Sequence, residues 1–209
     1  MTVTAIVLAG GRSTRFGADK LAAELDRGSV LAATIAAVAR LADDVVVAGP
    51  RIPDGVAADD PPVAALADRD PFAGPLAALG NVLGSRTFGS GDLGIVVGGD
   101  MPRLVVAVLV AMLDVLDQAQ EVDAVFLGPP PNGAASPPRR QPLPLAIRLE
   151  PAARAAREAI DAGERSLQAF IDRLAQAELP AWRWLPLDPD GLTLIDIDTR
   201  ADLDRLNAT

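Results

Sequence analysis

Residues 7–21 read VLAGGRSTRFGADKL, and this stretch joins an apolar run to a loop rich in glycine and positive charge. The run that leads into it, residues 3–8, is apolar and contains β-branched side chains, which predicts a strand buried on both faces. Gly10 and Gly11 have no Cβ, so backbone N–H groups there can approach a bound group closely. We therefore expect this loop to bind a base or a phosphate.

Cationic side chains follow the two glycines within ten residues. Arg12, Arg15 and Lys20 can neutralise a polyphosphate, the arginines through bidentate hydrogen bonds and the lysine as a point charge. The pattern is neither GxxxxGK[ST] nor GxGxxG. The alternative is an ordinary strand-to-helix turn with solvated charges; we favour a phosphate site because spacing, charge and strand context agree.

The composition restricts the possible chemistry. The chain has 209 residues, half of them hydrophobic, which predicts one domain over residues 1–209. A net charge of −9 argues against nucleic acid or an acidic membrane as partner. The sequence has no Cys and no His, which excludes disulfides, thiolate zinc sites and His-dependent nucleophiles, so any metal would be held by oxygen, as Mg²⁺ prefers. Without a signal peptide or membrane span, the chain is predicted to be cytoplasmic.

Strand and helix patterns alternate along the chain. Strands are expected at residues 3–8, 44–48, 93–98, 122–127, 143–147, 182–187 and 193–197. Helices are expected at residues 30–41, 75–83, 105–118, 151–162, 166–177 and 200–207, with loops at 50–73 and 128–142. This alternation predicts an α/β fold with a mostly parallel sheet covered on both faces. Ligands bind outside the carboxyl ends of the strands in such sheets.

Asp100 comes just after the strand expected at residues 93–98, as Gly10 and Gly11 come just after the first strand. Both segments should lie at the same edge of the sheet, so that a cationic loop and a carboxylate face one cleft. Asp100 is therefore a candidate ligand for Mg²⁺. The alternative is an N-cap for a helix that begins near Met101.

Asp196 and Asp198 form a second acidic motif, IDIDT. If this segment is a strand, its two-residue period places both carboxylates on one face. They are candidates for a metal-binding pair, or else acids that cap the helix expected at residues 200–207.

Two weaker candidates lie in loops. Asp68 precedes the Gly74-Pro75 helix entry, which could line the same cleft. Arg139, Arg140 and Gln141 form a second cationic cluster that suits another anionic substrate, or a pair of solvated charges.

These motifs together resemble the molybdenum cofactor guanylyltransferase family of nucleotidyltransferases. LAGGRSTRFGADK resembles the family signature LAGGxSxRxGxDK, FAGPLAAL its GPLAGL segment and GGDMPRL its CDMP segment. RRQPLPLAI, AGERSLQAFIDRL and IDIDTRADL are similar to RxQPLxA, AGxRSxxxxL and NxNTPEDL, in family order over nearly the whole chain.

The resemblance implies a three-layer α/β/α, Rossmann-like fold of the nucleotide-diphospho-sugar transferase type. It implies an enzyme that binds GTP and Mg²⁺ and transfers GMP to the phosphate of molybdopterin, releasing pyrophosphate. Transient contact with cofactor-synthesis or molybdoenzyme partners is a further expectation.

The resemblance also implies roles for the candidate residues. Backbone groups of the first loop would contact base and ribose, Lys20 with Arg15 would contact the phosphates, and Asp100 would bind Mg²⁺, with Asp196 and Asp198 as further ligand candidates. The nucleotide site would comprise Leu8, Ala9, Gly10, Gly11, Lys20, Asp68 and Asp100. The acceptor site would comprise Arg139, Arg140 and Gln141.

The chain departs from the family pattern at several points, and one of them, an insertion, concerns the acceptor more than the nucleotide. Asp196 and Asp198 stand where the family has two asparagines, the insertion GPPPNGAASPP precedes Arg139, and Asp68 lies one residue nearer the GPL segment. The alternatives are transfer from CTP, transfer to another acceptor such as phospholactate or a sugar phosphate, and a nucleotide-binding module without catalysis.

Overall fold

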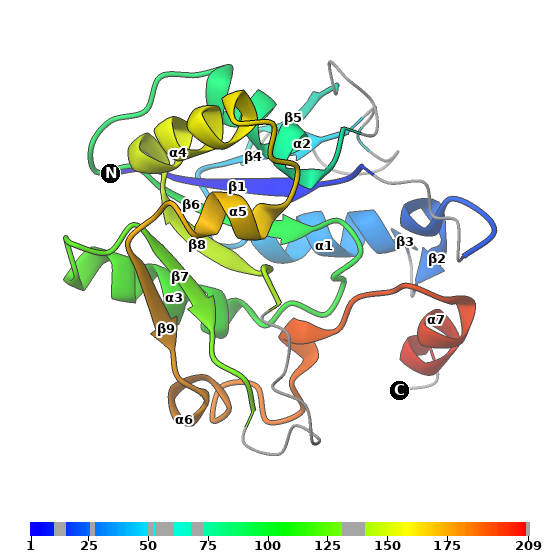
Figure 1. Ribbon diagram of the computed structural model, residues 1–209. Coiled ribbons are helices and arrows are strands. Elements are labelled where there is room, and N and C mark those ends of the chain that lie inside the picture. Colours follow the sequence, from blue (N-terminus) through cyan, green and yellow to red (C-terminus); the bar gives the residue numbers. More distant parts are fainter. Residues whose placement is uncertain are drawn as a thin grey trace.

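A seven-stranded sheet forms the centre of the computed structural model (Figure 1). The structure describes residues 1–10, 16–25, 28–49, 52, 61–67, 73–130 and 141–207. The strand order is β5-β4-β1-β6-β8-β7-β9. The strands are β1 (Val3–Leu8), β4 (Asp44–Ala48), β5 (Val63–Leu66), β6 (Leu93–Gly98), β7 (Ala124–Leu127), β8 (Leu145–Arg148) and β9 (Gln176–Leu179). Every pairing is parallel except those of β8, which runs antiparallel to both of its neighbours.

The central strands are apolar on both faces, as the run at residues 3–8 predicts. Ala5 and Val7 of β1 belong to one core cluster, and Ile6 and Leu8 belong to the other. This alternation follows from the two-residue period of a strand, so both faces of the sheet need a covering layer of helices.

Helices supply those two layers (Figure 1). On one face, α1 (Val30–Val38), α3 (Val106–Gln118) and α6 (Ala181–Trp184) contribute to the core. On the other face, α2 (Pro75–Gly84), α4 (Leu149–Asp161) and α5 (Leu167–Ile171) do so. The expected α/β fold with three layers is confirmed.

A third, smaller core joins the segment after the first loop to the end of the chain. This core, which we call the flank cluster, consists of Phe16, Leu25, Val30, Ile197, Leu203 and Leu206. It packs α7 (Arg200–Asn207) near the short hairpin of β2 (Glu24–Leu25) and β3 (Gly28–Ser29). The Arg200 guanidinium lies 5.5 Å from the centroid of the Phe16 ring. Residues far apart in the sequence thus meet beside the carboxyl ends of β1 and β6.

The chain order reverses at β1. From β1 the chain goes to β4 and β5 on one side, and it then returns to β6 on the other side of β1. A crevice forms in α/β sheets where neighbouring connections leave in opposite directions, and ligands bind there. The topology therefore singles out the carboxyl ends of β1 and β6.

Most predicted elements are confirmed with small differences at their ends. The Ser29 hydroxyl caps α1 by accepting a hydrogen bond from the Ala32 amide at 3.1 Å. That helix ends at Val38, earlier than expected. Pro75 begins α2, as predicted from the Gly74-Pro75 pair.

Four secondary-structure predictions are wrong. The loop expected at residues 50–73 contains β5, a short edge strand that extends the sheet beyond β4. The helix expected at residues 166–177 ends at Ile171, and Gln176–Leu179 pairs with β7 as β9 because sheet pairing outweighs the helical spacing.

The strands expected at residues 182–187 and 193–197 are also absent from the described sheet. Pro180 starts a helical turn at α6, and the indole N–H of Trp184 donates to the Gly128 carbonyl at 2.9 Å. In the second segment, the Asp188 carboxylate accepts from the amides of Leu192 and Thr193, which stabilises the 3₁₀ turn η2 (Leu192–Leu194).

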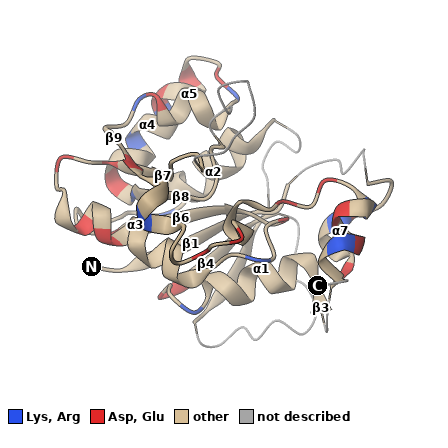
Figure 2. Cartoon of the chain, turned by 90° about the horizontal axis from the view of Figure 1, so that it is seen from below, with Lys and Arg blue, Asp and Glu red and all other residues tan. Residues whose placement is uncertain are grey.

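Charged residues of both signs lie on α7, and acidic ones lie on α3 (Figure 2). No helix in the described part of the chain is long and apolar enough to span a bilayer.

Candidate active site at the ends of β1 and β6

The turn that carries Asp100 is fixed by its backbone. The Gly99 amide donates to the Leu8 carbonyl at 2.9 Å, which joins the turn to β1. The Thr34 hydroxyl of α1 donates to the Gly99 carbonyl at 3.1 Å. The Ile197 amide donates to the Asp100 carbonyl at 2.9 Å. Three separate parts of the chain therefore position this carboxylate.

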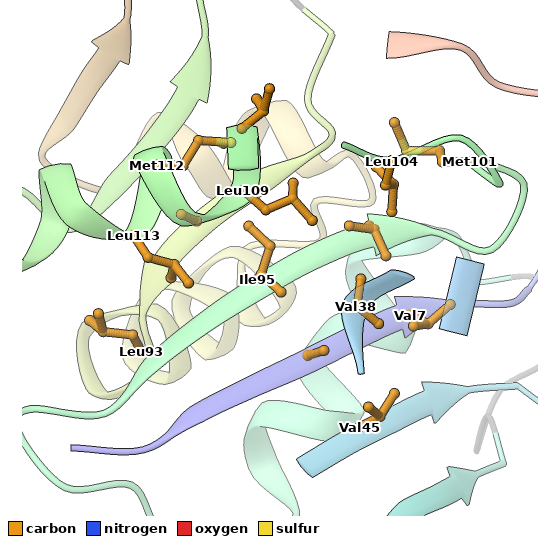
Figure 3. Close-up of a cluster of buried hydrophobic side chains, with 14 of the residues drawn as sticks. Val7, Val38, Val45, Leu93, Ile95, Met101, Leu104, Leu109, Met112 and Leu113 are labelled. Atoms are coloured by element: carbon orange, nitrogen blue, oxygen red, sulfur yellow. The ribbon is translucent and has the colours of Figure 1, made fainter. Parts of the chain in front are cut away.

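Apolar residues after Asp100 anchor the same turn in the core. Met101 and Leu104 are buried in the cluster that contains Val7 and Val38, as Figure 3 shows. Asp100 directly precedes this anchor, and its side chain keeps 22% of its area exposed.

Lys20 enters the crevice from a short 3₁₀ turn, η1 (Lys20–Ala22). The Asp19 carboxylate caps that turn by accepting a hydrogen bond from the Leu21 amide at 3.1 Å. The Leu21 side chain lies against Gly99, where an added Cβ would come within 3.4 Å of it. The turn thus packs on the Asp100 segment and directs Lys20 toward it.

Lys20 contacts two carboxylates. Its Nζ atom lies 2.6 Å from Oδ2 of Asp100 and 3.1 Å from Oδ1 of Asp198. The prediction that the cationic loop segment and Asp100 share one edge of the sheet is confirmed. The alternative for Asp100, a helix N-cap, is wrong because α3 has Val105 at its N-cap.

Asp198 is positioned by the start of α7. Oδ2 of Asp202 accepts hydrogen bonds from the amides of Asp198 and Thr199, at 3.2 and 2.7 Å, and the Asp202 amide donates to the Thr199 hydroxyl at 3.3 Å. This reciprocal pair is a capping box. Thr199 and Asp202 therefore cap α7, which was the alternative role for Asp196 and Asp198.

We call Lys20, Asp100, Asp196 and Asp198 the carboxylate–lysine cluster. Burial lowers the pKa of Lys20, but hydrogen bonds and charges from Asp100 and Asp198 raise it by more, so the net shift is upward. The pKa of Asp196 is raised, first by loss of hydration and then by the charges of Asp100 and Asp198. Asp196 keeps an exposed surface, so water screens part of this effect. Asp196 thus interacts with both other carboxylates even though residues 193–197 form no strand of the sheet.

The donor set suits Mg²⁺ with a bound nucleotide better than a metal held by protein alone. Among the described residues, no three carboxylates are close enough to ligate one ion. Asp100 and Asp198 both present an oxygen to the same cation, Lys20 Nζ. Mg²⁺ is commonly held by one or two carboxylates and completed by substrate phosphates and water.

The other candidate residues are placed less fully. Leu8 and Ala9 are buried, and the Ala9 amide donates to the Ala48 carbonyl at 2.9 Å, while Gly10, two residues after β1, is exposed. Gln141 is exposed before β8. The remaining candidates, Gly11, Arg15, Asp68, Arg139 and Arg140, lie outside the described residues, as does Arg12. Their roles stay predictions.

Two features of the site are not among the sequence predictions. Lys20 is the only lysine in the chain, and every other cationic side chain is an arginine. That count is visible in the sequence and singles out Lys20. Gly98 is the second feature: a Cβ there would lie 2.4 Å from Oδ1 of Asp100, so the absence of a side chain leaves room for the carboxylate. No sequence pattern indicates this contact.

Comparison with known proteins places the chain among nucleotidyltransferases. Residues 5–178 match the MobA-like NTP transferase domain. A probable molybdenum cofactor guanylyltransferase from Chloroflexus aggregans is 31% identical over 211 aligned positions, covering 100% of this chain and 95% of the relative.

Solved structures agree on the fold. Molybdopterin-guanine dinucleotide biosynthesis protein A from Archaeoglobus fulgidus superposes with a TM-score of 0.74 at 20% identity, covering 98% of this chain and 97% of the other. A 2-C-methyl-D-erythritol 4-phosphate cytidylyltransferase from Thermus thermophilus has a TM-score of 0.66 at 19% identity, with 97% and 96% covered. The fold is thus shared by enzymes named for different bases, whereas the family match and the full-length relative are more specific. The chain belongs to the MobA-like NTP transferase family.

Proposed function

We propose that this protein transfers GMP from GTP to the phosphate of molybdopterin and releases pyrophosphate. The observation that carries the proposal is the contact of Lys20 with Asp100 and Asp198 at the carboxyl ends of β1 and β6. The guanine donor and the pterin acceptor rest on the name of the 31% identical relative, which covers the whole chain.

The cluster offers what nucleotidyl transfer needs without a covalent intermediate. A phosphate oxygen of the acceptor forms a bond to the α-phosphorus of GTP, and the bond to the β-phosphate bridging oxygen breaks. Lys20 would bind the triphosphate, and Asp100 with Asp198 would hold Mg²⁺. When bound, Mg²⁺ neutralises the charge that develops on the phosphates. Catalysis is then positioning and charge neutralisation, which requires neither His nor Cys.

The nucleotide base would meet the end of β1. Buried backbone groups discriminate a base edge strongly, because a wrong base leaves them unpaired. Gly10 is exposed there and gives the base access to the backbone. We assign Leu8, Ala9, Gly10 and Gly11 to the base and ribose, and we assign Arg15 and Asp68 to the rest of the nucleotide.

The acceptor would bind along the same edge of the sheet, on the β8 side. Since β8 is antiparallel, its first residues lie at the carboxyl edge of the other strands. Gln141 shortly precedes β8, and Arg139 and Arg140 are next to it in the sequence. We assign these three to the acceptor phosphate, for which arginine is well suited. Arg140→Ala should raise the apparent acceptor constant and leave GTP binding nearly unchanged.

The deciding experiment combines each of the four NTPs with molybdopterin, and separately with phospholactate and a sugar phosphate, and measures pyrophosphate release. We expect product with GTP and molybdopterin. Product with CTP alone would reassign the donor, as the fold shared with cytidylyltransferases allows. Product with phospholactate but not with molybdopterin would refute the acceptor assignment. Nucleotide binding without any transfer would identify a binding module.

A further inference from the structure

The Lys20 ammonium occupies the oxygens that the proposed function gives to Mg²⁺. Its Nζ atom is 2.6 Å from Oδ2 of Asp100 and 3.1 Å from Oδ1 of Asp198, with only 17% of the Lys20 side chain exposed. The ammonium of Lys20 therefore contacts both carboxylates at once.

Lys20 and a divalent ion compete for these two carboxylates. Mg²⁺ binds oxygen at about 2.0–2.1 Å and dehydrates reluctantly. An ammonium in contact with the same oxygens would lie within a few ångströms of the ion, where the two like charges repel each other. Both cations fit only if Lys20 finds another anionic partner, and a bound triphosphate supplies one.

The residue type fits an exchange of partners. Lysine carries a compact charge on a flexible four-carbon stem, whereas arginine binds one carboxylate in a fixed bidentate arrangement. Position 20 is the only lysine in the sequence, and every other cationic side chain is an arginine. Asp198, with 49% of its side chain exposed, has more freedom to shift than Asp100, with 22%.

We propose that Lys20 blocks the metal site in the nucleotide-free protein, so that the divalent ion binds only together with the triphosphate. The nucleotide draws Lys20 onto its phosphates and frees Asp100 and Asp198 for the ion. This inference rests on the proposed function, which assigns these carboxylates to Mg²⁺. It adds an order of binding, in which the metal ion does not bind before the nucleotide.

The first test titrates Mn²⁺ into nucleotide-free protein and measures free Mn²⁺ by electron paramagnetic resonance. We expect weak binding to the wild type and one site that is tighter by about tenfold or more in Lys20→Gln, because a unit charge has been removed beside the ion. Lys20→Arg, which keeps the charge, should stay weak. Lys20→Gln combined with Asp198→Asn should lose the gained site.

Two results would overturn the proposal. One is equal Mn²⁺ affinity in wild type and Lys20→Gln, with both shown to be folded by circular dichroism. The other is a gain in Lys20→Arg as large as that in Lys20→Gln, since the charge would then not be what blocks the ion.

A second test uses the wild type alone, so it does not depend on any variant folding. Because the chain has one lysine, protein labelled with [ε-¹³C]lysine gives one side-chain ε-carbon resonance. Mg²⁺ alone should leave this resonance unmoved, and Mg²⁺ with α,β-methylene-GTP should shift it. A saturable shift with Mg²⁺ alone would refute the blocked site. Failure of the analogue to bind would count against the proposed function instead, and the Mn²⁺ titration would still decide the present inference.

Discussion

The ammonium of Lys20 and the carboxylate of Asp100 lie 2.6 Å apart, although 80 positions separate the two residues in the chain. The contact exists because β1 and β6 are parallel neighbours, with Leu8 paired to Gly98. Each residue follows one of these strands, so the sheet brings a cation and an acid together at one edge. Neither side chain belongs to the buried core, and we propose for both a role in chemistry more than in folding.

Asp100→Asn should lower nucleotidyl transfer by roughly 100- to 1000-fold, because a neutral amide would hold the proposed Mg²⁺ less tightly than the carboxylate and so weaken the charge neutralisation at the phosphates. The free energy of unfolding should change far less than transfer does, because Lys20 keeps Asp198 as a partner and the lost charge no longer repels Asp196. Steady-state transfer at saturating Mg²⁺ and urea unfolding would measure the two effects.

Asp92 provides the matched control. It lies just before β6, whereas Asp100 lies just after the same strand. Its carboxylate accepts hydrogen bonds from the amides of Thr2 and Gly89, at 3.1 and 2.8 Å. Asp92→Asn should reduce stability and leave transfer intact. Wild-type turnover in Asp100→Asn would remove that residue from the catalytic machinery.

Gly98→Ala should impair transfer with little loss of stability. The new Cβ would lie 2.4 Å from Oδ1 of Asp100, and that flexible side chain can move away, which takes the carboxylate off Lys20. Gly94→Ala, on the same strand, is the contrasting variant: its Cβ would meet Leu149 at 2.7 Å and Ile147 at 3.2 Å in the core. It should destabilise the protein by about 1–3 kcal/mol through overpacking. Thermal unfolding and transfer assays on both variants would reveal whether the two effects separate as expected.

Asp196→Asn should stabilise the protein at neutral pH and lose that advantage in acid. The folded-state pKa of Asp196 is raised above its ordinary value of 3.8, so the folded protein binds a proton more readily than the unfolded chain. This group's contribution to stability is present below the unfolded pKa and is lost as pH rises through the folded pKa. Above the folded-state pKa, the ionised Asp196 therefore lowers the free energy of unfolding, and Asp196→Asn removes this unfavourable contribution.

The gain should stay below about 1 kcal/mol, because Asp196 is exposed and water screens its charge. Urea unfolding of both proteins at pH 7 and below pH 4 would measure it. A constant difference across this range would contradict the assignment to ionisation.

The fold and the site differ in how far the sequence predicts them. Buried strands such as residues 3–8 and 93–98 were predictable, because continuous apolar runs followed by glycine indicate central strands of an α/β sheet. β9 was not, because its four residues, QAEL, continue a helical spacing, and only their pairing with β7 makes them a strand.

The acidic motif at residues 196–198 illustrates a correct grouping with a wrong element. The two-residue period predicted that Asp196 and Asp198 lie together; Asp198 contacts Lys20, and the charges of Asp100 and Asp198 act on Asp196. The strand itself is wrong, since the Ile197 amide binds the Asp100 carbonyl instead of a neighbouring sheet strand. Only tertiary contacts determine that choice, and no local pattern contains them.

Leu203→Ala should cost both stability and transfer, because the flank cluster joins α7 to the segment that carries Lys20. Leu203 is 8% exposed and packs in the cluster that contains Phe16 and Ile197. Removing its side chain leaves a cavity that should cost about 2–3 kcal/mol. The capping box at the start of α7 then holds Asp198 less firmly, so the Michaelis constant for the metal-bound nucleotide should rise.

Leu174→Ala is the matched control, since Leu174 is 7% exposed and belongs to the cluster on the far face of the sheet. Both variants should unfold at lower urea concentrations, but at a temperature where both are folded only Leu203→Ala should bind the nucleotide more weakly. Equal Michaelis constants in the two variants would mean that the flank cluster stabilises the fold without positioning Asp198.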